Sequence, residues 1–167
     1  MTDTNGTIVT TVDMTGLTVM TIAAQPDYPR TLSVFVTNAA GDAIVGTVTI
    51  VGIDQNGVGI TEVISITAAG AKNGVKAFAK ITSATFAKIS GTLTGSSDTI
   101  ALGFGPAIGL PAAPGAKYDR LIKAAFDDAD DLGTFDATYG LYTPAGTMNG
   151  AKLLEVTFLF SVPIDVY

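Results

Sequence analysis

The chain contains no cysteine, no histidine and no tryptophan among its 167 residues. Without cysteine it can form neither a disulfide nor a thiolate metal site, and without histidine it lacks the commonest zinc ligand and the commonest general base. Triads of the Ser-His-Asp or Cys-His type are therefore excluded. These absences lead us to expect a protein that is not an enzyme and that holds no cofactor.

Charged residues are also scarce, at 14% of the chain, against about a quarter in ordinary soluble domains. Their balance is acidic, with a net charge of −6. Nucleic acids and anionic membrane surfaces both attract basic proteins, so neither is an expected partner. No apolar run reaches the roughly 18 residues of a membrane span. The surface must consist largely of Thr, Ser, Ala and Gly, which is common in proteins whose surfaces are covered by neighbouring subunits.

Short runs in which apolar residues alternate with threonine dominate the sequence and predict half-buried β-strands. The clearest runs are 32–37, 45–52 and 60–66. Asn56-Gly57, between the last two runs, predicts a tight hairpin turn because glycine supplies a positive φ. With roughly ten to twelve such runs, the expected fold is all-β: an antiparallel β-sandwich or a jelly-roll-like barrel.

We expect a single β domain over residues 1–167, with two segments that depart from the strand pattern. Residues 1–14 are rich in threonine and predict an extended N-terminal arm. Residues 105–116 contain three prolines and three glycines, which predicts an irregular crossover. The last run, 153–162, is apolar at most positions and is expected in the middle of a sheet, covered on both faces.

One acidic cluster is a weak candidate for a cation site, because calcium prefers carboxylate oxygens. It consists of Asp127, Asp128, Asp130 and Asp131. The EF-hand spacing fails, since Tyr139 stands where that loop requires glutamate, so a solvated turn is the favoured interpretation and no metal is expected. Glu62 lies within a predicted strand, where we expect it to face solvent.

Several of these pieces follow one another in an order that resembles a recurrent type of tailed-bacteriophage virion protein. They are Pro29–Val34 with its Pro-Arg start, Gly46–Gly57, Ile60–Ile64, the loop 68–74, Lys76–Phe78, Ile81–Ser83, Ser97–Ile100 and Gly109–Pro111. Within that type the chain is most similar to a small capsid decoration, or cement, protein. The resemblance implies a β-sandwich or jelly roll without catalytic residues, commonly trimeric. It also implies synthesis in the bacterial host cytoplasm and binding to the major capsid protein on the outer surface of the virion, which the protein stabilises.

Two segments are candidates for the contact with that capsid. A threonine-rich arm is suited to adding a strand to the sheet edge of a neighbour, and the Pro-rich crossover is the second candidate. The residues concerned are Thr7, Ile8, Val9, Thr10, Pro106, Ile108, Leu110 and Pro111. A frayed terminus and an ordinary crossover are the alternatives for these segments.

Two other functions stay open at this stage, and a hydrolase is the weakest further hypothesis because histidine and cysteine are absent. A phage tail or baseplate component would have the same kind of fold and would polymerise into rings or tubes. A carbohydrate-binding module would belong to a different class, and sugar binding usually needs exposed aromatic platforms. The chain has no tryptophan, and its tyrosines are scattered at positions 28, 118, 139, 142 and 167.

Overall fold

The computed structural model describes residues 7–38, 43–95, 97–111, 120–126, 129–146 and 153–159. These residues form strands and no helix, and the strands pair antiparallel, which confirms the all-β prediction. The strands are β1 (Val9–Asp13), β2 (Val19–Met20), β3 (Arg30–Thr37), β4 (Val45–Ile53), β5 (Gly59–Ile66), β6 (Gly70–Asn73), β7 (Lys80–Ser90), β8 (Thr99–Gly109), β9 (Arg120–Phe126), β10 (Ala129–Asp130), β11 (Thr134–Asp136), β12 (Leu141–Thr143) and β13 (Leu154–Leu159).

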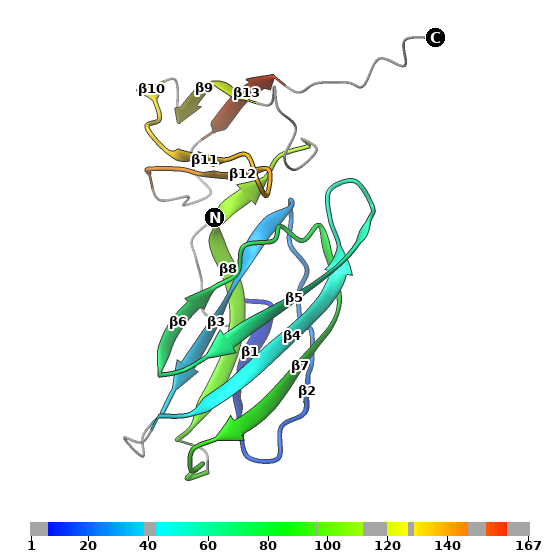
Figure 1. The fold of residues 1–167 in the computed structure, drawn as a ribbon, viewed down its shortest axis with the longest axis vertical. Helices are drawn as coiled ribbons and strands as arrows, with labels where there is room; N and C mark the ends of the chain where they lie inside the picture. The colour runs from blue at the N-terminus through cyan, green and yellow to red at the C-terminus, as the bar shows by residue number, and fades with distance from the viewer. Residues whose placement is uncertain are drawn as a thin grey trace.

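Strands β1 to β8 form the main body of the molecule (Figure 1). One sheet has four strands in the order β2-β7-β4-β5, and the other has the order β11-β12-β8-β3-β6 with β1 also paired to β8. Both contribute to one apolar core, which includes Val48 and Ile50 of the first sheet and Val34 and Leu102 of the second. Buried and more exposed residues alternate along β4 and β5, as a period of two predicts.

The β4–β5 hairpin forms where the sequence predicts it. Oδ1 of Asp54 accepts hydrogen bonds from the backbone N–H groups of Asn56 (2.8 Å) and Val58 (2.9 Å). Gly57 has a φ of 78°, a conformation that glycine adopts without the steric penalty of a Cβ. The turn therefore fixes the register of the β4–β5 ladder.

Strand β8 is longer than the sequence predicts. Residues 105–109 of the expected crossover, 105–116, belong to this strand, and residues 112–116 lie outside the described part of the chain. A register shift in the β3–β8 ladder lets Pro106 pass through the sheet, because a bulge tolerates a residue without an N–H. The expectation of irregular structure was therefore wrong for residues 105–109.

Strand β8 also joins the main body to a second part, which we call the small lobe and which consists of β9 to β13. Most of β8 pairs with β1 and β3, while Ile108 and Gly109 pair with β12. Figure 1 shows the small lobe at one end of the long axis of the molecule. Three of its strands have the order β10-β9-β13, so the run 153–162 lies, in its described part, at an edge and not in the middle of a sheet.

The described part of the predicted N-terminal arm lies on the main body. It forms β1, which pairs with β8, and the side chains of Ile8 and Val9 belong to the core. The carbonyl of Ile8, just before β1, also accepts hydrogen bonds from the N–H groups of Ala23 and Ala24, at 2.7 and 3.4 Å. From residue 7 onward this segment is therefore part of the fold, because its apolar side chains complete the core.

Candidate functional site

The first group of predicted partner contacts divides between the core and the surface. Ile8 and Val9 are 0% and 1% exposed. Thr7 is half-buried and Thr10 is exposed. The two apolar side chains cannot reach a partner unless the core opens, which corrects the expectation that they lie on a free arm.

The second group lies at the junction between the main body and the small lobe. Leu110 is buried, and Ile108 packs against the apolar cluster to which Leu110 belongs. The carbonyl of Leu110 accepts a hydrogen bond from Nε2 of Gln55 at 2.7 Å. Pro106 is half-buried and Pro111 is exposed. This segment therefore joins two parts of the same chain, and only Pro111 presents a largely free surface.

The acidic cluster is engaged in contacts within the small lobe as far as it is described. Asp130 is exposed and lies 3.8 Å from the ammonium of Lys123, and Asp127 and Asp128 lie outside the described residues. Oδ1 of Asp131 accepts the N–H of Ala145 at 3.1 Å. Across the described ranges, no group of three or more potential metal ligands occurs.

The second carboxylate oxygen of Asp131 holds a buried tyrosine. The hydroxyl of Tyr142 donates to Oδ2 of Asp131 at 2.6 Å and accepts the N–H of Gly133 at 3.1 Å. Burial, together with the hydrogen bond to Asp131, raises the pKa of Tyr142 to about 12. The hydroxyl therefore stays protonated over the physiological range and keeps the turn after β10 closed onto β12.

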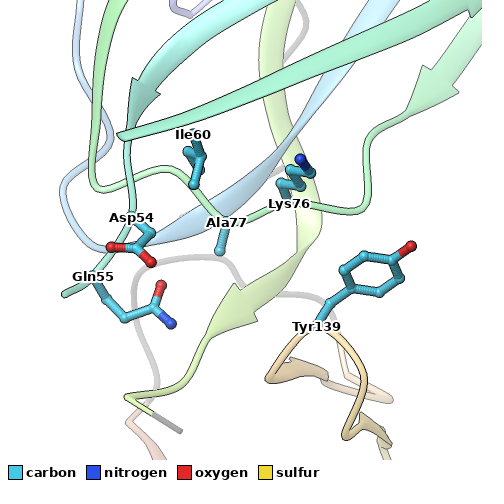
Figure 2. A pocket seen from close by; sticks show the side chains of 6 residues that line it. All are labelled: Asp54, Gln55, Ile60, Lys76, Ala77 and Tyr139. Carbon is cyan, nitrogen blue, oxygen red and sulfur yellow. The ribbon is translucent and has the colours of Figure 1, made fainter. Parts of the chain in front are cut away.

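A pocket of about 150 Å³ lies where the β4–β5 turn faces the small lobe (Figure 2). Its lining residues are Asp54, Gln55, Ile60, Lys76, Ala77 and Tyr139. In Figure 2, Tyr139 projects from the small lobe toward the segment of the main body that carries Lys76 and Ala77. The pocket therefore marks the joint between the two parts of the molecule.

Three of the polar side chains around this pocket, those of Asp54, Gln55 and Lys76, are engaged by the fold itself. Oδ1 of Asp54 holds the hairpin turn, and the amide of Gln55 donates to Leu110. Nζ of Lys76 donates to the carbonyl of Thr61 at 2.8 Å. The pocket is also smaller than the roughly 300–1,000 Å³ of typical small-molecule sites. Its geometry favours a structural joint over a catalytic or cofactor site.

Among the described residues of the main body, three charged side chains are buried. They are Arg30, Glu62 and Asp98, at 0%, 6% and 0% exposure. Nη2 of Arg30 donates to the carbonyl of Gly105 at 2.8 Å, and its guanidinium lies 4.5 Å from the centre of the Phe104 ring. The carboxylate of Asp98 accepts the hydroxyl of Thr94 at 2.8 Å and also its N–H. These roles are not predicted from the sequence, where the one available signal is a lone charge beside or within an apolar run.

Glu62 faces the interior and not the solvent, so the expectation for this residue was wrong. It lies on the same face of β5 as the buried Ile64 and Ile66. Oε1 accepts the N–H groups of Val75 (2.5 Å) and Lys76 (3.2 Å), while Oε2 is buried without a hydrogen-bond partner. Burial raises the pKa of this carboxyl, against the opposing effects of the two backbone hydrogen bonds and the charge of Lys76.

No protein-family model, no curated protein and no solved structure matches this chain. Within the described residues, no helix has the length and apolar character needed to cross a membrane. The function is therefore inferred from the residues, their arrangement and the resemblance in their order.

We expect Glu62→Gln to become more stable than the wild type as the pH rises, by on the order of 1 kcal/mol at neutral pH. The pKa of Glu62 in the folded protein is raised above its ordinary value of 4.5. The stability that this group contributes is therefore full below about pH 4.5 and is lost as the pH rises through the raised pKa. Glutamine keeps an acceptor for Val75 and Lys76 but has no charge to desolvate.

Urea unfolding followed by circular dichroism, from about pH 4 to about pH 8, measures this difference. Glu155→Gln removes the same charge from an exposed position on β13 and controls for the change in net charge. A difference between wild type and Glu62→Gln that stays constant over this range would contradict the prediction.

Proposed function

We propose that this chain is a structural virion protein of a tailed phage, a decoration protein of the β-sandwich class that binds the outer surface of the assembled capsid. The proposal depends on one observation: the segments that resemble phage virion proteins contain the buried charged residues of the main body. Arg30, Glu62 and Asp98, the buried charged residues of the main body, all lie within the segments that carry the resemblance. These segments therefore supply the internal framework of the main body.

Each of the three buried charges ties separate parts of that framework together. Arg30 connects the start of β3 to β8 through Gly105, and Glu62 holds the backbone of residues 75 and 76 against β5. The carboxylate of Asp98 closes the turn that leads into β8 through Thr94. A framework of this kind supports a rigid binding module, because a rearrangement that breaks one of these hydrogen bonds leaves a buried charged group less well satisfied.

We place the capsid contact on the small lobe. Among the described residues, the two most exposed large apolar side chains are Leu132 (89%) and Leu153 (72%), and both belong to this lobe. Leu132 follows β10 and Leu153 immediately precedes β13. Apolar side chains left in water at one end of an elongated molecule are suited to an interface with another protein.

A decoration protein stabilises a shell by linkage, because it binds the assembled state in preference to the free subunits. Many copies bind one shell, so a modest affinity at each site is sufficient. The resemblance further implies that the bound form is a homotrimer and that its partner is the major capsid protein.

The test uses purified wild-type protein and expanded capsids of the phage that encodes it. We expect binding at a fixed number of copies per capsid and a higher temperature of capsid disruption. The double variant Leu132→Asp/Leu153→Asp should bind about tenfold or more weakly, whereas Val58→Asp, at an exposed position of the main body, should bind as the wild type does. Failure of the wild type to bind capsids, together with its absence from purified heads, would overturn the proposal.

The same virion fractionation separates the head from the tail. Recovery of the protein in tails, or its spontaneous assembly into rings or tubes seen by negative-stain microscopy, would favour the tail or baseplate role instead.

A further inference from the structure

The outer face of the four-stranded sheet is a regular array of small, uncharged side chains. Strands β5, β4, β7 and β2 lie side by side in Figure 1. Their ladders align one row across all four strands, made of Val63, Thr49, Thr85 and Val19. The uncharged face consists of this row and its two neighbours: Thr61, Val51 and Ser83 on one side, and Ser65, Thr47 and Ala87 on the other.

This face exposes apolar as well as hydroxyl groups. Val19, Val63 and Val51 are 65%, 57% and 38% exposed. On the six-stranded sheet, by contrast, β3 and β8 are buried along most of their length on both faces. The main body therefore has one broad sheet face, on β2, β7, β4 and β5, that no described part of the chain covers.

The charged residues of these four strands all lie outside the uncharged face. The four strands contain three charged residues, and none belongs to the array: Glu62 points inward, and Lys80 and Lys88 lie toward the two ends of β7. The chain as a whole carries a net charge of −6. Two copies of the chain therefore repel each other in most relative orientations, and the repulsion is weakest where the two uncharged faces meet.

We propose that the uncharged face binds the same face of a second copy of this chain, around a two-fold axis. A partner for this surface must itself present few charges there, because a charge buried against Val and Thr side chains would lose its hydration without gaining a counter-charge. The uncharged face of a second copy meets that condition. β-branched side chains of two such faces can interdigitate at the roughly 10 Å spacing at which stacked sheets pack.

The size of the face sets the expected strength of the contact. Strands β4, β5 and β7 have nine, eight and eleven residues and β2 has two, so the sheet covers roughly 400–500 Å² per copy. Two such faces bury roughly 900 Å² in total, near the lower limit for a specific interface. We therefore expect a weak, reversible dimer. A two-fold contact uses the same patch on both copies, so it is independent of any trimer, which needs two different patches.

The test compares two valines of equal exposure on the same hairpin. Val63, in the uncharged face, is 57% exposed, and Val58, at the hairpin turn and outside the face, is 58% exposed. Sedimentation equilibrium from about 10 µM to about 1 mM should show the wild type and Val58→Glu dimerising alike, and Val63→Glu about tenfold or more weakly. Val19→Glu, at the other end of the same row, should behave as Val63→Glu does and serves if that variant misfolds.

A charge-swap experiment identifies the occupant. Val63→Glu and Val63→Lys should each dimerise poorly alone, and a mixture of the two should associate more tightly than either variant alone, because the two faces then carry opposite charges. A wild type that stays monomeric at about 1 mM, or a Val63→Glu variant that dimerises as Val58→Glu does, would overturn the inference. So would a monomeric wild type whose capsid binding Val63→Glu abolishes, since the face would then take the capsid and not a second copy. The sedimentation and mixing measurements need no capsid, so their failure leaves the proposed function untouched.

Discussion

Arg30→Ala is expected to lower the free energy of unfolding by about 4 kcal/mol, the largest effect of any single substitution considered. Arg30 is fully buried, with its guanidinium 4.5 Å from the centre of the Phe104 ring and 5.2 Å from the centre of the Tyr28 ring. Truncation leaves a cavity and removes the donor that satisfies the carbonyl of Gly105. A loss of this size is a large fraction of the roughly 5–15 kcal/mol that stabilises a typical domain.

Two further variants separate volume from charge at position 30. Arg30→Met keeps much of the volume and should recover about half of the loss, because it also removes the penalty of burying a charge. Arg30→Lys keeps the charge but lacks the planar group that lies near the two rings, so it should be closer to alanine. Lys123→Ala, at a 62% exposed side chain, is the control and should change stability by less than about 0.5 kcal/mol. Because the chain has no tryptophan, urea unfolding is followed by circular dichroism; equal stability of Arg30→Ala and Lys123→Ala would refute the prediction.

Gly52→Ala is expected to destabilise the protein by about 3 kcal/mol. Gly52 is a buried residue of β4, which pairs with β7. A Cβ at this position would collide with the backbone carbonyl oxygen of Lys80 and would lie 2.8 Å from Cδ1 of Phe78. The carbonyl belongs to the neighbouring strand, so the collision is relieved only by a shift of the backbone. In thermal unfolding the midpoint should fall by about 6–12 °C.

Gly59→Ala is the matched control, on the strand that pairs with the other side of β4. A Cβ at Gly59 meets no atom within 4 Å, so this substitution should leave stability unchanged or raise it by about 0.5 kcal/mol. If both alanine variants unfold at the same temperature, the close approach of β4 and β7 at Gly52 does not exist in solution.

Local sequence signals were sufficient for much of the main body. The runs 32–37, 45–52 and 60–66 lie within β3, β4 and β5, and the Asn56-Gly57 turn lies between the last two. These elements are decided by contacts between near neighbours, namely a period of two in hydrophobicity and a glycine with positive φ. No long-range information is needed to recognise them.

The sequence was insufficient where a residue's partner lies far away in the chain. Pro106 and the glycines around it favour irregular structure locally. In the fold, a bulge against β3 accommodates Pro106, and two hydrogen bonds between Thr31 Oγ1 and Ala107 allow β8 to continue past it. Glu62 resembles a solvent-facing charge because the N–H groups that bind it come from residues 75 and 76.

By itself, the sequence determined that the protein is all-β, poor in charge and without the residues of the common catalytic triads, because these follow from composition and short-range periodicity. The tertiary structure alone decided that β1 is part of the body, that Arg30, Glu62 and Asp98 are interior, and that Ile108 and Leu110 join two parts of one chain. It also decided which sheet face stays exposed. These outcomes depend on which distant segments pair and pack, since burial is a property of the assembled core and not of any local run.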